Sequence, residues 1–377
     1  MKEPIYLDHA ATTPMHEEVI DAVSTCMRET FGNPSSIHQY GRQSRRLLDE
    51  ARRTLANSIH AKEKDVYFTS GGTEADNLAV IGTALANRDK GNHIITSKVE
   101  HHAVLHAAEY LETIGFDVTY LPVDENGIVD VSTVASHLRD DTILVSVMMV
   151  NNEVGAIQPI REIGQLLNEH QAYFHTDAVQ AYGLLPIDVT DLMVDLLTVS
   201  AHKINGPKGV GFLYSQPAVS VQPHLFGGSQ ERLKRPGTEA LPLIKGMEKA
   251  VSLFKNDLAK EYEAYRTLFL DQLNTLGVKY SINGNLENAS PAIVNLSFDG
   301  MNVESLLMNF DLEGIAASSG SACTAGSIES SHVLSAMYEQ NDERLNSAIR
   351  FSFGLANNEG QIKEAAKRIA NVISRLQ

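Results

Sequence analysis

Short runs of β-branched and other apolar residues alternate with longer amphipathic stretches through the first two thirds of the chain. The runs have the length of buried strands, and the stretches between them are long enough to form helices. Right-handed crossovers join strands in this arrangement, so the pattern predicts an α/β fold with a mostly parallel sheet flanked by helices. We expect the strands at residues 66–69, 93–96, 118–121, 143–150, 173–176, 196–199 and 210–214.

The pattern changes near residue 245, where a charged helical run, two strand-like segments and a last helix follow one another. This order is typical of an α+β unit. We therefore expect a large domain over residues 1–245 and a smaller C-terminal domain over residues 246–377, with residues 1–15 available to pack against the smaller one. The elements of the second part are expected at 247–276, 293–298, 349–353 and from 361 onward.

Composition excludes several classes of function. The chain has 377 residues, and its formal net charge of -16 disfavours a direct nucleic-acid interface. The longest apolar stretch, residues 144–150, is too short to cross a bilayer, and no export segment is visible at the start, so we expect a cytoplasmic protein without membrane contact. Two cysteines, Cys26 and Cys323, cannot by themselves build a disulfide framework or a four-thiolate metal site.

The stretch FTSGGTEADNLA at 68–79 predicts an anion site. A strand ends, two glycines follow, and Thr73 with Asp76 has the spacing of a capping box that opens a helix. Free N–H groups at a helix start attract anions, and Gly72 leaves room for one to approach. The alternative is a well-formed helix start without a ligand. The glycine spacing fits neither the dinucleotide fingerprint nor the P-loop.

Two further strand ends carry reactive side chains. YFHTDAVQA places Asp177 and Gln180 where open α/β sheets bind ligands, although a carboxylate there also serves as a helix cap. The segment at 195–211 places Ser200, His202 and Lys203 after the next strand, where a lysine is otherwise a solvated charge. An amine for an aldehyde, a carboxylate for a ring nitrogen and donors for a phosphate are together what pyridoxal phosphate requires.

Histidine and cysteine supply the remaining candidates. His101 and His102 stand at a strand-to-helix junction, but adjacent side chains diverge and no further ligand follows at metal spacing. We expect no metal, and we expect one imidazole to cover a ring and move protons. Cys323 lies among small residues that bury little apolar surface, so we expect a mobile nucleophile there rather than a buried thiol. Cys26 has the surroundings of a helix face and is expected to serve packing.

The chain resembles the cysteine desulfurases of the NifS/IscS type, a branch of the fold-type I, class V aminotransferase-like enzymes. The similarity runs almost from end to end in matching order, which makes it specific. It is carried by YLDHAATTP, GNPSSIH, TSGGTEADNLA, EHHAVL, NNEVG, HTDAVQ, SAHKINGPKG, RPGTEA, SSGSACTAG and IRFSFG.

The resemblance implies roles for individual residues. Lys203 bonds the cofactor pyridoxal phosphate, Asp177 pairs with its ring nitrogen, Gln180 donates to its ring hydroxyl, and His101 stacks on the ring. The phosphate ligands and the two residues that hold the carboxylate of L-cysteine follow from the same motifs. The phosphate is bound by Gly72, Thr73, Ser200 and His202, with Thr238 reaching it from the partner subunit of a homodimer, and the substrate carboxylate is held by Asn152 and Arg350.

The resemblance also implies the reaction. Sulfur passes from L-cysteine to Cys323, which leaves L-alanine and an enzyme persulfide, and the persulfide passes to an acceptor protein. The acceptor is an iron-sulfur scaffold or a tRNA 2-thiouridylase, and the short C-terminus after the last helix resembles members that serve the latter. Selenocysteine or cysteine sulfinate as substrate, and a non-catalytic sulfur carrier of the same fold, are the alternatives.

Overall fold

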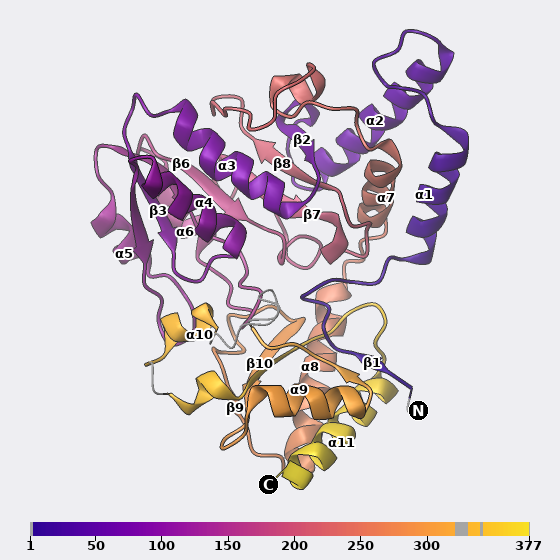
Figure 1. The fold of residues 1–377 in the computed structure, drawn as a ribbon, viewed down its shortest axis with the longest axis vertical. Helices are drawn as coiled ribbons and strands as arrows, with labels where there is room; N and C mark the ends of the chain where they lie inside the picture. The colour runs from indigo at the N-terminus through magenta and orange to yellow at the C-terminus, as the bar shows by residue number, and fades with distance from the viewer. Residues whose placement is uncertain (1–2, 321–330, 340–341, 377) are drawn as a thin grey trace.

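The computed structural model describes residues 3–320, 331–339 and 342–376. Its main feature is a seven-stranded sheet in the order β2-β8-β7-β6-β5-β3-β4 (Figure 1). Only β8 runs antiparallel to its neighbours, β2 and β7, and the other pairs are parallel, so the predicted α/β class is confirmed. The strands are β2 (Val66–Thr69), β3 (His93–Ser97), β4 (Asp117–Leu121), β5 (Thr142–Ser146), β6 (Tyr173–Asp177), β7 (Leu196–Ser200) and β8 (Gly211–Ser215).

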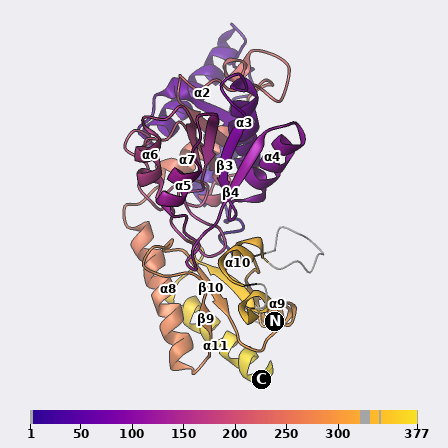
Figure 2. The ribbon, with the colours of Figure 1, turned by 90° about the vertical axis from the view of Figure 1, so that its left-hand side faces the viewer.

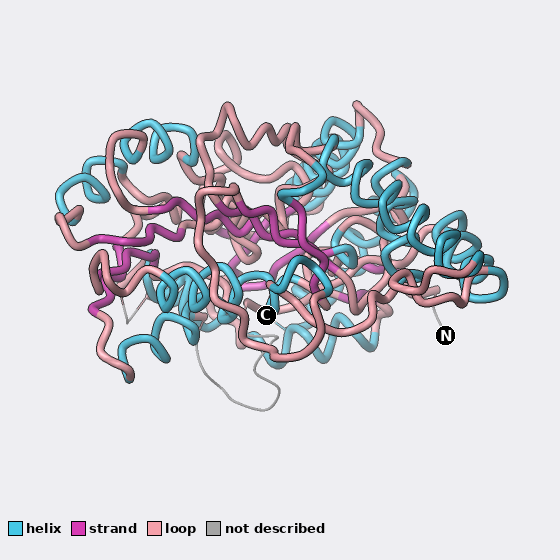
Figure 3. The backbone as a smooth tube through the Cα atoms, turned by 90° about the horizontal axis from the view of Figure 1, so that it is seen from above, coloured by secondary structure: helices cyan, strands magenta, loops and turns pink. Residues whose placement is uncertain are grey.

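Both faces of this sheet are buried by helices (Figure 3). Alternate residues of the strands belong to different cores: Ile94 and Leu196 pack with α3 and α4, whereas Ile95 and Leu197 pack with the helices of the opposite face. This is why the strands appear in the sequence as continuous apolar runs. The covering helices are α3 (Gly72–Ala86) and α4 (His102–Thr113) on one face, and α1 (Glu17–Glu29), α2 (Gln39–Asn57), α5 (Val131–His137), α6 (Ile160–Leu167) and α7 (Leu241–Ser252) on the other.

The second part of the chain forms a separate core below this sheet (Figures 1 and 2). A three-stranded antiparallel sheet in the order β12-β10-β9 packs with long helices around a cluster of phenylalanines that includes Phe269 and Phe351. The N-terminal strand also lies here, because β1 pairs with β11. The elements are β1 (Ile5–Tyr6), α8 (Leu258–Thr275), β9 (Ser281–Ile282), β10 (Ile293–Ser297), α9 (Val303–Leu312), β11 (Ile315–Ala316), α10 (His332–Met337), β12 (Ala348–Ser352) and α11 (Glu359–Leu376).

Two expected elements are wrong in extent. The strand expected at 143–150 ends at Ser146, where Glu100 accepts the N–H of Met148 in place of β3, although Val147 and Met149 still donate to His175 and Asp177 of β6. The continuous helix expected at 247–276 is two helices, α7 and α8. Leu253 and Phe254 interrupt them, since both side chains pack against the core of the large sheet. None of the helices in the described ranges is long and apolar enough to span a membrane.

One close approach between backbones joins the sheet to the start of α3. A Cβ atom at Gly211 of β8 would lie 2.4 Å from the carbonyl oxygen of Val199 and 2.9 Å from the Cα of Gly71. Neither backbone atom moves without displacing a strand or the first turn of α3. Gly211 therefore sets the distance between the sheet and this helix start.

We predict that Gly211→Ala lowers the free energy of unfolding by about 1–3 kcal/mol, because the added methyl group overpacks a rigid contact. Urea denaturation followed by circular dichroism measures the change. Gly360→Ala is the matched control, since its Cβ meets only the side chain of Asn358 at 3.2 Å. Equal stability of the Gly211 variant and the wild type would contradict the close packing.

Candidate functional site

The carboxyl end of β6 places Asp177 and Gln180 at one edge of the sheet. Asp177 is buried, and its Oδ1 accepts the N–H of Val179 at 2.8 Å within a turn. No helix lies between β6 and β7, a stretch that the structure describes in full, so the helix-cap alternative is wrong. Burial raises the pKa of Asp177 to about 6, while the Val179 N–H and the charge of Lys203 act in the opposite direction. Gln180 donates its Nε2 hydrogen to the carbonyl oxygen of Ala10 at 2.9 Å.

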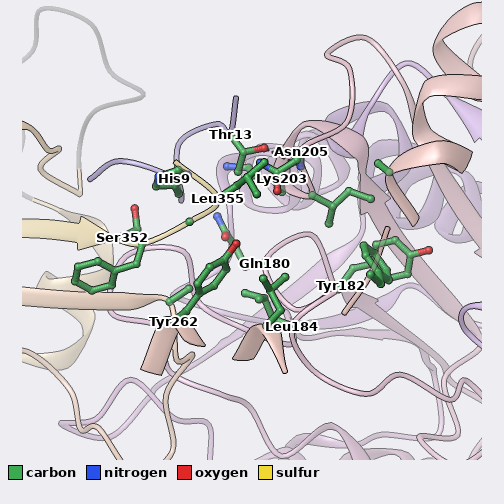
Figure 4. A pocket seen from close by; sticks show the side chains of 18 of the residues that line it. His9, Thr13, Gln180, Tyr182, Leu184, Lys203, Asn205, Tyr262, Ser352 and Leu355 are labelled. Carbon is green, nitrogen blue, oxygen red and sulfur yellow. Dashed lines mark hydrogen bonds between the residues drawn. The ribbon is translucent and has the colours of Figure 1, made fainter. Parts of the chain in front are cut away.

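Lys203 lies in a short 3-10 turn, Ala201–Lys203, that directly follows β7. Its Nζ donates to the carbonyl oxygens of Ala10 and Ala11, the latter at 2.9 Å. Lys203 and Gln180 also line a cavity of about 300 Å³, with Tyr262 of α8 on its other side (Figure 4). The amine predicted from sequence therefore lies beside the predicted carboxyl and amide groups.

The start of α3 is an open cradle rather than a capped end. Gly71 has φ 151°, and no side chain caps the helix, so the N–H groups of the first turn stay available. A Cβ at Gly72 would lie 3.1 Å from Val179 and 3.6 Å from the Cβ of Ser200, which brings this turn next to the ends of β6 and β7. Thr73 is exposed at the same turn.

The predicted capping box of Thr73 and Asp76 is wrong. Glu74 instead accepts the N–H of Ser70 at 2.8 Å, and Asp76 is buried on the inner face of α3, 3.7 Å from Nε2 of His175. Glu74, two positions before Asp76, thus satisfies the backbone N–H that lies just before α3. Asp76 is thereby free to face the sheet.

His101 and His202 flank the lysine, and both are neutral near pH 7. His101 caps α4 by accepting the N–H of Ala103 at 3.1 Å, and Nδ1 of His202 lies 3.2 Å from the hydroxyl of Thr12. Burial, followed by the charge of Lys203, lowers the pKa of each imidazole to about 4.

His102 contacts two further imidazoles. Its ring centroid lies 5.0 Å from that of His106 and 4.7 Å from that of His332 on α10. Within the ranges that the structure describes, no group of three or more His, Cys, Asp or Glu side chains is arranged to hold a metal ion.

Arg350 of β12 reaches the same edge from the smaller sheet. The guanidinium donates from Nη1 to the carbonyl oxygen of Asn152 at 2.9 Å and pairs through Nη2 with Oδ1 of Asp8 at 2.8 Å. Asn152 thus meets Arg350 through its backbone. Asp8 is a site residue that the sequence reasoning missed, although it stands within the motif YLDHAATTP, one of the segments that carry the resemblance.

Sequence reasoning also missed a buried polar layer behind Asp177. His175 contacts the hydroxyl groups of Ser146 at 2.8 Å and Thr198 at 3.1 Å, and burial lowers its pKa to about 3. Burial likewise raises the pKa of Glu100 to about 8 and raises that of Asp76. In the sequence, this layer shows only as polar residues within apolar runs, which is a weak signal.

Three candidates lie outside this cluster. Thr238 is exposed on the segment before α7 and makes no hydrogen bond within the described part of the chain. Cys323 lies outside the described residues, so its predicted nucleophilic role stays a prediction. Cys26 is buried on the inner face of α1, and burial raises the pKa of its thiol.

The fold is that of a class-V aminotransferase. Residues 5–364 match the family Aminotransferase class-V, and the chain belongs to that family, whose members use pyridoxal phosphate.

Proteins that are similar along the whole chain identify the branch of the family. The chain is 56% identical, over 99% of its length and all of the relative, to a Bacillus subtilis protein named "Putative cysteine desulfurase IscS 1". It is 46% identical, over its full length and 96% of the relative, to cysteine desulfurase IscS of Dictyoglomus turgidum. Within the family the chain is a cysteine desulfurase of the NifS/IscS type.

Solved structures agree with this placement. A NifS-like protein superposes with a TM-score of 0.92 at 33% identity, over 99% of this chain and all of that one. SspA in complex with cysteine superposes with a TM-score of 0.83 at 34% identity, over 92% of this chain and 98% of that one.

We predict that His101→Asn flattens the dependence of stability on pH. The unfolded imidazole takes up a proton near pH 6.5 and the folded one near pH 4. The stability that uncharged His101 contributes is therefore fully present above pH 6.5 and is lost as the pH falls toward 4. Asparagine keeps the helix cap and does not titrate. Urea denaturation at pH 7, 6 and 5 should show wild type losing up to about 1.4 kcal/mol per pH unit more than the variant. Parallel losses would contradict a buried neutral imidazole.

Proposed function

We propose that this protein removes sulfur from L-cysteine with pyridoxal phosphate, producing L-alanine and a persulfide on Cys323. The observation that carries the proposal is the meeting of Lys203, Asp177 and the uncapped glycine start of α3 at one edge of the sheet. These are the three kinds of group that the cofactor needs. The solved structure of SspA in complex with cysteine supports an amino-acid substrate.

Each residue has one part in holding the cofactor. Lys203 offers its amine to the aldehyde, Asp177 its carboxylate to the ring nitrogen, and Gln180 its amide to the ring hydroxyl. The phosphate fits the first turn of α3, where the Cβ that Gly72 lacks would fill the space, and it is bound by Gly72, Thr73, Ser200 and His202. When bound, pyridoxal phosphate supplies an electron sink for the α-carbon of an amino acid.

The substrate is held and deprotonated by the chain's own groups. Arg350 and Asn152 bind its carboxylate, and the planar guanidinium suits a two-pronged contact. His101 covers the cofactor ring and, being neutral, receives a proton during the reaction. Arg350 is buried and His101 half-buried, which limits the access of water to the reacting atoms.

Sulfur transfer balances without an external oxidant. The thiolate of Cys323 attacks the sulfur of the bound cysteine, the carbon–sulfur bond breaks, and its electron pair stays on the carbon, which takes up a proton. L-Cysteine and one thiol thus become L-alanine and one persulfide. A thiolate is the attacking form, so the reaction belongs in a compartment that keeps thiols reduced, and we place it in the cytoplasm.

We extend the proposal to a homodimer that passes its sulfur to an acceptor protein, a tRNA 2-thiouridylase or an iron-sulfur scaffold. Exposed apolar side chains gather where α1 leads into α2: Phe31 is 73% exposed, Ile37 91% and Tyr40 53%. A patch of this kind on a soluble protein favours an interface. In such a dimer the exposed Thr238 would reach the phosphate of the partner's site.

The reaction is tested with Cys323→Ala and Lys203→Ala. We expect Cys323→Ala to keep the visible absorbance of the bound cofactor while sulfide and alanine release from L-cysteine is abolished. Lys203→Ala should lose both the normal absorbance and the activity, because no amine remains for the aldehyde. Lys208→Ala, an exposed lysine five residues further along, is the control. Normal cysteine turnover by Cys323→Ala would refute the persulfide role. Turnover of selenocysteine or cysteine sulfinate by the same variant, without turnover of cysteine, would favour those substrates.

The dimer is tested with Ile37→Asp. We expect wild type to sediment as a dimer and this variant as a monomer, because a desolvated charge at a buried interface opposes association. Met308→Asp changes another exposed apolar residue, on α9, which is 69% exposed, and should leave the dimer intact. A monomeric wild type, or a dimeric Ile37 variant, would contradict the interface.

A further inference from the structure

Asp8 lies two residues after β1, and its carboxylate joins two other segments of the chain. Its Oδ1 pairs with Nη2 of Arg350 at 2.8 Å, and its Oδ2 accepts the hydroxyl hydrogen of Ser318 at 2.7 Å. The side chain of Asp8 is 16% exposed and that of Arg350 only 4%. Salt screens a pair this well buried much less than a pair on the surface.

The backbone beneath these side chains is held independently of them. Arg350 and Ser318 exchange two backbone hydrogen bonds, with N–H to O distances of 2.7 and 3.3 Å. Ser352 donates its N–H to the carbonyl of Leu7 at 2.8 Å, and β1 pairs with β11 on the other side. The strands that carry the three side chains therefore stay aligned without the Asp8 carboxylate. What the carboxylate controls is the orientation of the guanidinium group.

The guanidinium of Arg350 is held at both of its terminal nitrogens. A guanidinium has five N–H donors in one plane. Here Nη2 meets Asp8 and Nη1 meets the carbonyl of Asn152 at 2.9 Å, whereas Nε is buried without a partner in the described part of the chain. Because contacts are made at two different nitrogens, the guanidinium plane cannot rotate about the Cδ–Nε bond. The unused donors consequently keep one direction.

We propose that Asp8 is a positioning residue for Arg350, holding the guanidinium in the plane in which its free N–H donors meet the carboxylate of the substrate. The inference rests on the proposed function, since it assumes that Arg350 binds that carboxylate. A planar two-pronged contact tolerates little rotation of either group. Asp8 thus contributes to the selection of amino acids over plain amines without touching the substrate.

The role predicts a change in binding rather than in the chemical step. In the cofactor-loaded enzyme, Asp8→Ala should raise KM for L-cysteine by about 10- to 100-fold, the value of one charge-assisted hydrogen bond, and leave kcat nearly unchanged. Asp8→Asn keeps an oxygen acceptor and should fall between Asp8→Ala and wild type. Asp191→Asn, which removes an exposed pairing with Arg161, is the control and should change neither constant.

Two unreactive ligands separate positioning from a general loss of structure. L-Alanine carries the carboxylate, ethylamine lacks it, and the binding of each is followed through the absorbance of the bound cofactor. We expect the preference for L-alanine over ethylamine to shrink in Asp8→Ala by the same 10- to 100-fold. Equal weakening of both ligands together with a lower Tm would overturn the proposal, because the role of Asp8 would then be structural.

Arg350→Ala in the same assay tests carboxylate binding by Arg350 separately from the positioning role of Asp8. If this variant keeps the preference for L-alanine, Arg350 does not bind the carboxylate, and both that part of the proposed function and the present inference are wrong. If Arg350→Ala loses the preference while Asp8→Ala keeps it, Arg350 binds the carboxylate unaided, and only the positioning role is refuted. Loss of the preference in both variants, with the fold and the cofactor absorbance retained, is the result that supports Asp8.

Discussion

The carbonyl oxygen of Ala10 accepts hydrogen bonds from both Gln180 and Lys203, and the site depends on this contact. The Ala10 N–H is given to the hydroxyl of Ser352 on β12, so one residue near the N-terminus links the large sheet to the small one. The chain from β1 to α1 therefore forms a strap between two hydrophobic cores. Groups from both cores meet where this strap crosses, and the amine, the amide and the arginine all lie along it.

Removal of water shapes the chemistry of the same edge. Burial is the leading cause in each shifted pKa of the site: it raises the values of Asp177 and Glu100 and lowers those of His101 and His175. Each shift favours the uncharged form, as a low-dielectric environment requires. The pKa of Asp177 reaches about 6 and that of Glu100 about 8, and the Val179 N–H and the charge of Lys203 both stabilise the Asp177 anion.

Local pattern was sufficient for much of the fold. The seven strands of the large sheet were predicted from apolar runs, because strands buried on both faces are mostly apolar. The extent of β5 and the break between α7 and α8 were missed. In both cases a distant group competes with local structure: Glu100 takes the N–H of Met148, and the large core takes Leu253 and Phe254.

The sequence by itself determined which reactive groups exist and that several stand at strand ends, since strand ends and glycines leave local marks. Its motifs also determined the family. Only the tertiary structure decided that Asp8 pairs with Arg350 and that Asp76 turns inward instead of capping α3. The physical reason is that ion pairs and burial depend on segments that are far apart along the chain, and no local pattern records which of them meet.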